Sequence, residues 1–151
     1  MRHPYYEAIL LIERAHRHFL EVVKADLDRL GIQDINNVQA LILYNVGQDE
    51  MTVGELTVRG YYLGSNVSYN VKKMVENGYL LQERSPHDRR SVRVKLSDKG
   101  LSLQKKLAEA FEKQSGALPG ATLTPEELNR MIEVLRKLER FWTGMVNYGG
   151  G

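Results

Sequence analysis

Polar and cationic side chains gather along residues 65–73, where their types and spacing suit contact with nucleic acid. Val67, Val71, Met74 and Val75 recur at helical spacing and form one apolar stripe. Off that stripe lie hydroxyls, amides, a phenol and two cations: Ser65, Asn66, Ser68, Tyr69, Asn70, Lys72 and Lys73. Amides and hydroxyls can read base edges in the major groove while lysines meet phosphates, although an ordinary solvated helix face has a similar composition.

A second basic group follows in a segment with the pattern of a β-hairpin. Val92, Val94 and Leu96 alternate with cations, which is typical of a half-buried strand, and residues 80–84 form the expected partner strand. The hairpin carries four arginines: Arg84, Arg89, Arg90 and Arg93. Guanidinium groups at the tip of such a wing suit the narrow, negative minor groove of DNA.

Charge is unevenly distributed over the 151 residues, although the net charge is only +2. From Arg59 to Lys99 there are nine Lys or Arg and four Asp or Glu, whereas the rest of the chain holds twelve basic and fifteen acidic residues. A basic head on a mildly acidic body is the charge pattern of a protein that presents one surface to phosphate.

The predicted hairpin resembles the wing of MarR-type winged helix-turn-helix regulators, in the run ENGYLLQERSPHDRRSVRVKLSDKG. Asp88 and Arg90 match the D-x-R element of that wing, and a Leu-Ser-x-x-Gly exit follows. The resemblance implies that Arg90 enters the minor groove and that Asp88 holds it in place. The run GSNVSYNVKKMVENGYL is also similar to a subgroup that controls genes for cell-wall L,D-transpeptidases.

Capping signals predict where the supporting helices begin and end. Three capping boxes open helices near residues 36, 52 and 124: Asn36 with Gln39, Thr52 with Glu55, and Thr124 with Glu127. Met51 is expected to pack on Leu56 before the second of these, and Gly78 ends the helix over residues 65–77. Ser97 caps a further helix, which is expected to end in a loop over residues 115–120.

Both ends of the chain carry long amphipathic helices, at residues 5–30 and from residue 125 onward. Their apolar stripes require a partner, so the sequence predicts a homodimer whose two-fold axis is matched by a palindromic operator. The predicted fold is mainly α with a small β-wing. We expect one domain over 1–151, with a winged helix-turn-helix DNA-binding lobe at 34–98 and dimerisation helices at 4–31 and 98–148.

Enzymatic and metal sites find little support in the sequence. It has no cysteine, no glycine-rich phosphate loop and no nucleophile–base set. Glu13 and His16 have the E-x-x-H spacing of helix-bundle metal sites, but the second such pair is missing, so a core or interface role for His16 is favoured. We expect no enzyme activity, no cofactor and no metal. The only apolar run has four residues, which predicts a cytoplasmic protein without membrane contact.

Two functions remain open at this point, a transcriptional regulator that binds double-stranded DNA and a winged-helix protein-interaction module. The paired Arg89 and Arg90 and the basic head favour the regulator. The family resemblance implies repression and a small aromatic or acidic effector. The candidate effector-binding residues are Tyr5, His16, Tyr44, Tyr61 and Tyr62. The sequence leaves open the operator, the target genes, the effector and the sign of regulation.

Overall fold

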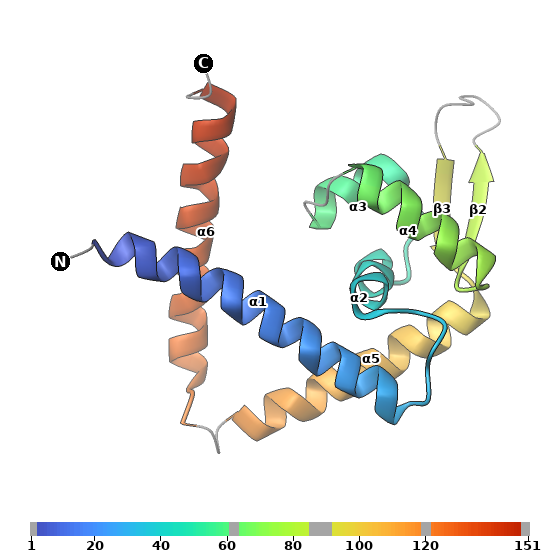
Figure 1. Cartoon of the computed structure of the whole chain (residues 1–151), viewed down its shortest axis with the longest axis horizontal. Helices are drawn as coiled ribbons and strands as arrows, with labels where there is room; N and C mark the ends of the chain where they lie inside the picture. Colours follow the sequence, from blue (N-terminus) through green and yellow to red (C-terminus); the bar gives the residue numbers. More distant parts are fainter. Residues whose placement is uncertain (1–2, 61–63, 85–91, 119–121, 149–151) are drawn as a thin grey trace. The chain divides into compact units, whose positions relative to one another are not determined.

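The computed structural model describes residues 3–60, 64–84, 92–118 and 122–148, in two compact units, Met1–Ala110 and Phe111–Gly151. The elements follow in the order α1 (Pro4–Arg29), α2 (Asn37–Val46), β1 (Met51–Thr52), α3 (Val53–Gly60), α4 (Gly64–Glu76), β2 (Leu80–Arg84), β3 (Val92–Leu96), α5 (Asp98–Ala117) and α6 (Pro125–Tyr148) (Figure 1). The three strands form one antiparallel sheet in the order β1-β3-β2. The predicted fold class, mainly α with a small β-wing, is confirmed.

The predicted helix starts are confirmed by their capping hydrogen bonds. At α2, the Asn36 side chain accepts from the Gln39 backbone N–H at 2.8 Å, and the Gln39 side chain accepts from the Asn36 N–H at 3.1 Å. The Thr52–Glu55 box opens α3 and the Thr124–Glu127 box opens α6 in the same way. Hydrogen bonds between residues three apart in the chain therefore account for these helix starts without tertiary contacts.

Two boundaries differ from the prediction. Met51 and Thr52 were expected only as the start of a helix, but they also form the short strand β1, in which Met51 pairs with Val94. The sequence could not indicate this strand because two residues are too few to show a strand period. Helix α5 continues through Gly116 to Ala117, so the predicted start of the loop at residue 115 is too early. A glycine within a helix costs only about 1 kcal/mol relative to alanine, which neighbouring turns can offset.

The core of the first unit lies between α2, α3, α4 and the sheet. On α4, Val67, Val71 and Met74 are buried, as their spacing predicted, whereas Val75 of the same stripe is only half-buried. Leu56 on α3 and Val94 on β3 are buried in the same core. Gly78 ends the α4 segment at a φ of +82°, in the left-handed region that glycine favours. Because one face of α4 is fixed in the core, its opposite face is presented outward.

The terminal helices expose large apolar side chains. On α1 these include Leu10 and Leu11, and on α6 they include Ile132, Leu135 and Phe141, the last with 57% of its surface exposed. Such faces are unusual for a soluble monomer and fit the predicted dimerisation role, which stays a prediction. Across the described ranges, no helix has both the length and the apolar character needed to span a membrane.

Candidate nucleic-acid interface

The outward face of α4 carries the polar and cationic side chains singled out in the sequence. Ser65 lies in the first turn of the helix. The exposed members are Asn66, Ser68, Tyr69, Lys72 and Lys73. Tyr69 has 61% of its surface exposed, although it is large and aromatic. Hydroxyl, amide, phenol and ammonium groups therefore share one solvent-facing surface, the arrangement that a groove-reading helix requires.

The contacts that Lys73 makes with the described residues are weak. Its Nζ lies 5.9 Å from the centre of the Tyr69 ring and 3.7 Å from a Glu76 carboxylate oxygen. Exposed ion pairs of this kind contribute little to stability because water and salt screen them. Lys73 can therefore exchange these contacts for a phosphate at small cost.

Asn70 differs from its neighbours on the helix. It is half-buried, its Nδ2 donates to the Asn66 carbonyl oxygen at 2.9 Å, and its Oδ1 accepts from Gln39 Nε2 at 3.1 Å. One donor and one acceptor of the amide are thus engaged within the protein. Its predicted role as a base reader stays a prediction.

The wing strands are confirmed at the predicted positions. Arg84 pairs with Val92, and Arg93 pairs with Glu83. Arg84 and Arg93 are exposed while Val94 is buried, so the ribbon presents its cations outward. Figure 1 shows this ribbon beside α4. The predicted tip residues Asp88, Arg89 and Arg90 lie outside the described residues.

A groove runs between the start of α3, helix α4 and the wing strands. Thr52 and Gly54 line it from the α3 side, Ser68 and Lys72 from α4, and Gln82 from β2. Hydroxyl donors, a cation and the first turn of a helix are groups that bind phosphate oxygens. A nucleic-acid backbone lying in this groove would therefore meet complementary chemistry next to the outward face of α4.

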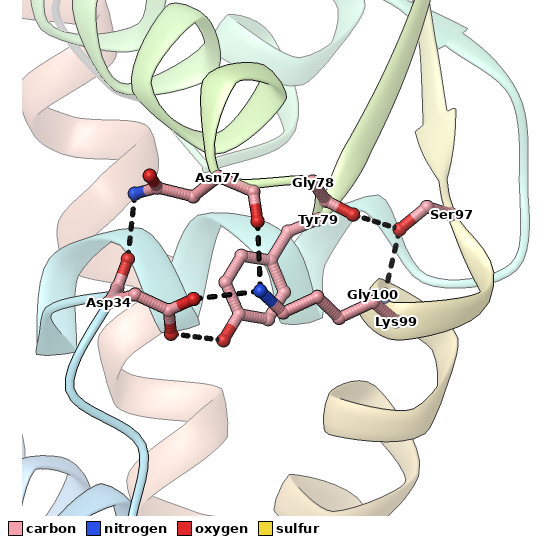
Figure 2. A network of polar contacts seen from close by, with 7 residues as sticks. All are labelled: Asp34, Asn77, Gly78, Tyr79, Ser97, Lys99 and Gly100. Atoms are coloured by element: carbon pink, nitrogen blue, oxygen red, sulfur yellow. Dashed lines mark hydrogen bonds and ion pairs between the residues drawn. The ribbon is translucent and has the colours of Figure 1, made fainter.

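A polar cluster that the sequence analysis missed holds this head together (Figure 2). Asp34, in the loop before α2, accepts from the Tyr79 hydroxyl at 2.5 Å and from Lys99 Nζ at 2.7 Å. Lys99 Nζ also donates to the Asn77 carbonyl at 2.9 Å and lies 4.3 Å from the centre of the Tyr79 ring. The cluster joins the α1–α2 loop, the end of α4 and the start of α5. Its members are distant in sequence, so no local pattern indicates it.

The Leu-Ser-x-x-Gly exit of the wing has a structural role at the same junction. The Ser97 backbone N–H donates to the Tyr79 carbonyl at 3.0 Å, and its hydroxyl donates to the Gly78 carbonyl at 2.5 Å. The same hydroxyl accepts from the Gly100 N–H at 3.1 Å, which caps α5 (Figure 2). Ser97 thereby ties the start of α5 to the segment that leaves α4.

The Asp34–Tyr79 contact predicts a dependence of stability on pH. The hydrogen bond from Lys99, and then that from Tyr79, lower the pKa of Asp34, so its contribution is present at neutral pH and is lost as acid protonates it. Burial, and then the hydrogen bond to Asp34, raise the pKa of Tyr79 above its usual range. Its neutral phenol therefore stabilises the fold below the unfolded pKa, about 10, and this contribution declines at higher pH.

We expect Tyr79→Phe to remove this loss of stability at alkaline pH. Urea unfolding of both proteins from about pH 8 to about pH 11 measures it, since the stability difference between them should shrink as the unfolded phenol ionises. A difference that stays constant over this range would contradict the assigned contact. Other titrating groups are common to both proteins and cancel in the comparison.

The candidate effector-binding residues are only partly placed. Tyr5 on α1 and Tyr44 on α2 are half-buried, and the groove beside α4 involves neither. His16 is exposed on α1, so the core alternative for this residue is wrong, while the interface alternative stays a prediction. Tyr61 and Tyr62 lie outside the described residues. Among the residues that are placed, no group of three His, Asp or Glu side chains could hold a metal ion.

Comparisons with known proteins agree with this arrangement. Residues 35–100 match a family model described as a winged helix DNA-binding domain. The chain is 37% identical over 145 residues to the exopolysaccharide II synthesis transcriptional activator ExpG of Rhizobium meliloti (strain 1021), covering 96% of this chain and 75% of that protein. It is 31% identical over 97 residues to the uncharacterized HTH-type transcriptional regulator YkoM of Bacillus subtilis (strain 168), covering 64% of this chain and 60% of that protein.

Solved structures share the fold at low sequence identity. AbsC, a MarR family transcriptional regulator from Streptomyces coelicolor, has a TM-score of 0.76 at 19% identity, covering 95% of this chain and 97% of that one. Streptococcus pneumoniae FabT, in complex with DNA, has a TM-score of 0.71 at 20% identity, covering 93% of this chain and 99% of that one.

A winged helix-turn-helix with a polar, cationic helix beside a basic ribbon defines a DNA-binding transcriptional regulator. Within that class, the chain belongs to the MarR family. The resemblance to the subgroup that controls L,D-transpeptidase genes stays a prediction.

Proposed function

We propose that the protein is a homodimeric, ligand-responsive repressor that binds a palindromic operator. The observation that carries the DNA-reading part is the outward face of α4, whose opposite face is fixed in the core. We propose residues 34–98 as the DNA-binding lobe, and 4–31 and 98–148 as the dimerisation helices. The relative ExpG is named an activator, and the same binding chemistry serves either outcome according to where the operator lies in the promoter.

The side chains of the head have separate proposed roles. On α4, the exposed groups that face the bases are Asn66, Ser68 and Tyr69, while Lys72 and Lys73 contact phosphate. On the ribbon, Arg84 and Arg93 add phosphate contacts beside the groove. Beyond the described strands, the proposed tip contacts come from Asp88, Arg89 and Arg90.

An effector would act on the first unit through aromatic and imidazole groups. The candidates with a described position are Tyr5, His16 and Tyr44, and Tyr61 and Tyr62 complete the proposed set. Stacking against phenol rings and pairing with imidazole suit a small aromatic or acidic molecule.

Selection of bound duplexes from a random DNA pool tests this function. We expect enrichment of one two-fold symmetric site whose half-sites lie about one helical turn apart. Recovery of no common sequence would contradict specific reading. It would favour the alternative of a protein-interaction module, whose binding lacks the steep salt dependence of phosphate contacts.

We expect Arg90→Ala to reduce operator affinity about tenfold or more, because one groove-inserting cation is lost. Asp88→Ala removes a negative charge, and on charge alone it should strengthen binding to DNA. We nevertheless expect it to weaken specific binding, since an arginine fixed in advance loses less entropy when it binds. Fluorescence titration of the operator at moderate salt measures both variants.

Arg136→Ala provides the control, because it removes one cation from α6 rather than from the head. It should leave operator affinity within about twofold of the wild type. Equal or tighter binding by Asp88→Ala would show that Asp88 does not position Arg90.

A further inference from the structure

A buried glutamine links the first turn of α2 to helix α4. Gln39 has only 7% of its surface exposed. Its Oε1 accepts from the Asn36 backbone N–H at 3.1 Å, and its Nε2 donates to Asn70 Oδ1 at 3.1 Å. Asn70 Nδ2 then donates to the Asn66 carbonyl at 2.9 Å, one turn earlier on α4. The three hydrogen bonds form one chain from the backbone of α2 to the backbone of α4.

The direction of this chain is fixed at both ends. A backbone N–H can only donate, so the Gln39 oxygen must face Asn36 and its NH2 group must face Asn70. A backbone carbonyl can only accept, so the Asn70 NH2 group must face Asn66 and its oxygen must face Gln39. A small rotation or slide of α4 would break the bond between the two amides. It would leave a buried Gln39 donor unsatisfied, which is unfavourable.

We propose that Gln39 and Asn70 are positioning residues for DNA reading: they set the rotation of α4 and its position along its axis relative to α2. In place of the base-reading role predicted from the sequence, Asn70 then supports reading without selecting a base itself. This inference rests on the proposed function, in which α4 enters the major groove. Discrimination between base pairs depends on hydrogen bonds with narrow distance and angle limits. A misplaced helix therefore weakens every base contact together while phosphate attraction remains.

The same turn of α2 also holds helix α1. Asn37 Nδ2 donates to the Leu20 carbonyl of α1 at 3.1 Å. Neighbouring residues on one turn thus bind α1 on one side and α4 on the other. Through this turn of α2, the position of α4 is fixed relative to the long N-terminal helix as well as to the core of the first unit.

Single substitutions separate positioning from direct reading. Asn70→Ala and Gln39→Met both leave the net charge unchanged. Each variant is titrated with the selected operator, with a panel of operators that carry single base-pair changes, and with a random duplex. We expect each variant to lose about fivefold in operator affinity, the effect of one hydrogen bond, with preference reduced at all positions that α4 reads. Affinity for the random duplex and its salt dependence should match those of the wild type.

A double variant and a control complete the test. Gln39→Met/Asn70→Ala should bind the operator no more weakly than either single variant, because both substitutions break one chain. Asn36→Ala removes the other half of the α2 capping box and leaves Gln39 and Asn70 in place. It should lower the unfolding midpoint while keeping the full operator preference.

Other outcomes would overturn the inference. If Asn70→Ala relaxed preference at one base pair only, Asn70 would be a direct reader; this comparison decides the question even where Gln39→Met fails to fold. If Asn36→Ala lost the operator preference as Gln39→Met does, the effect would come from helix capping. A wild type that bound operator and random duplex equally would overturn the proposed function, and this inference with it.

Discussion

Gly100→Ala is expected to destabilise the protein by about 3 kcal/mol or more, because the added methyl group has no space. A Cβ at position 100 would lie 2.2 Å from the Tyr79 carbonyl oxygen and 3.3 Å from the Leu96 Cβ. The obstructing atom belongs to the backbone, so no side-chain rotation can relieve the clash. That carbonyl also accepts the Ser97 N–H, hence the substitution would separate α5 from the segment that follows α4. Urea unfolding measures the loss.

Gly116→Ala is the matched control for this substitution. It makes the same chemical change in the same helix, where an added Cβ would meet no heavy atom of the described residues within 4 Å apart from those of its own stretch of helix. Alanine is the better helix former, so this variant should be as stable as the wild type or more stable by up to about 1 kcal/mol. Equal unfolding midpoints for Gly100→Ala and the wild type would show that the Tyr79 carbonyl and α5 do not approach this closely.

Leu135→Glu is expected to convert the protein from a dimer into a monomer. Leu135 lies on the stripe of α6 that also carries Ile132 and Met131, and all three are exposed in the single chain. Obligate dimer interfaces resemble a domain core, in which an unpaired carboxylate is strongly disfavoured. Sedimentation at micromolar concentration should give a dimer for the wild type and a mass near 17.3 kDa for the variant.

Lys137→Glu tests whether the position of the new carboxylate, rather than the change in net charge, causes the loss of the dimer. Residues 135 and 137 are two apart on a helix, so their side chains point in nearly opposite directions. Lys137→Glu changes the net charge by more than Leu135→Glu does, yet it should remain dimeric. A wild-type protein that sediments as a monomer would contradict the proposed dimer, and with it the two-fold symmetric operator.

Local signals account for most of what could be predicted from the sequence. Capping boxes at Asn36, Thr52 and Thr124 depend on residues three apart, and the buried stripe of α4 follows from its helical period. The resemblance to the MarR family is confirmed, and it was found from a continuous run of residues in the predicted wing. Such features are visible in one sequence because the interacting groups are neighbours along the chain.

Features that depend on distant residues were not predictable. The Asp34–Tyr79–Lys99 cluster joins positions 45 and 65 residues apart, and the Gln39–Asn70 bond spans 31. The stripe of α4 placed Asn70 off the buried face, but its partner on α2 could not be seen in that pattern. The strand β1 likewise exists only because Met51 and Thr52 find a partner in β3.

Direct titration of the selected operator and a scrambled duplex, over a series of salt concentrations, tests the central claim that the head reads DNA. The operator should bind at least about a thousandfold more tightly than the scrambled duplex near physiological salt. Binding to both should weaken linearly on a log–log plot as salt rises, because phosphate contacts release counterions. Equal affinities for the two duplexes, or operator binding that does not respond to salt, would contradict the account.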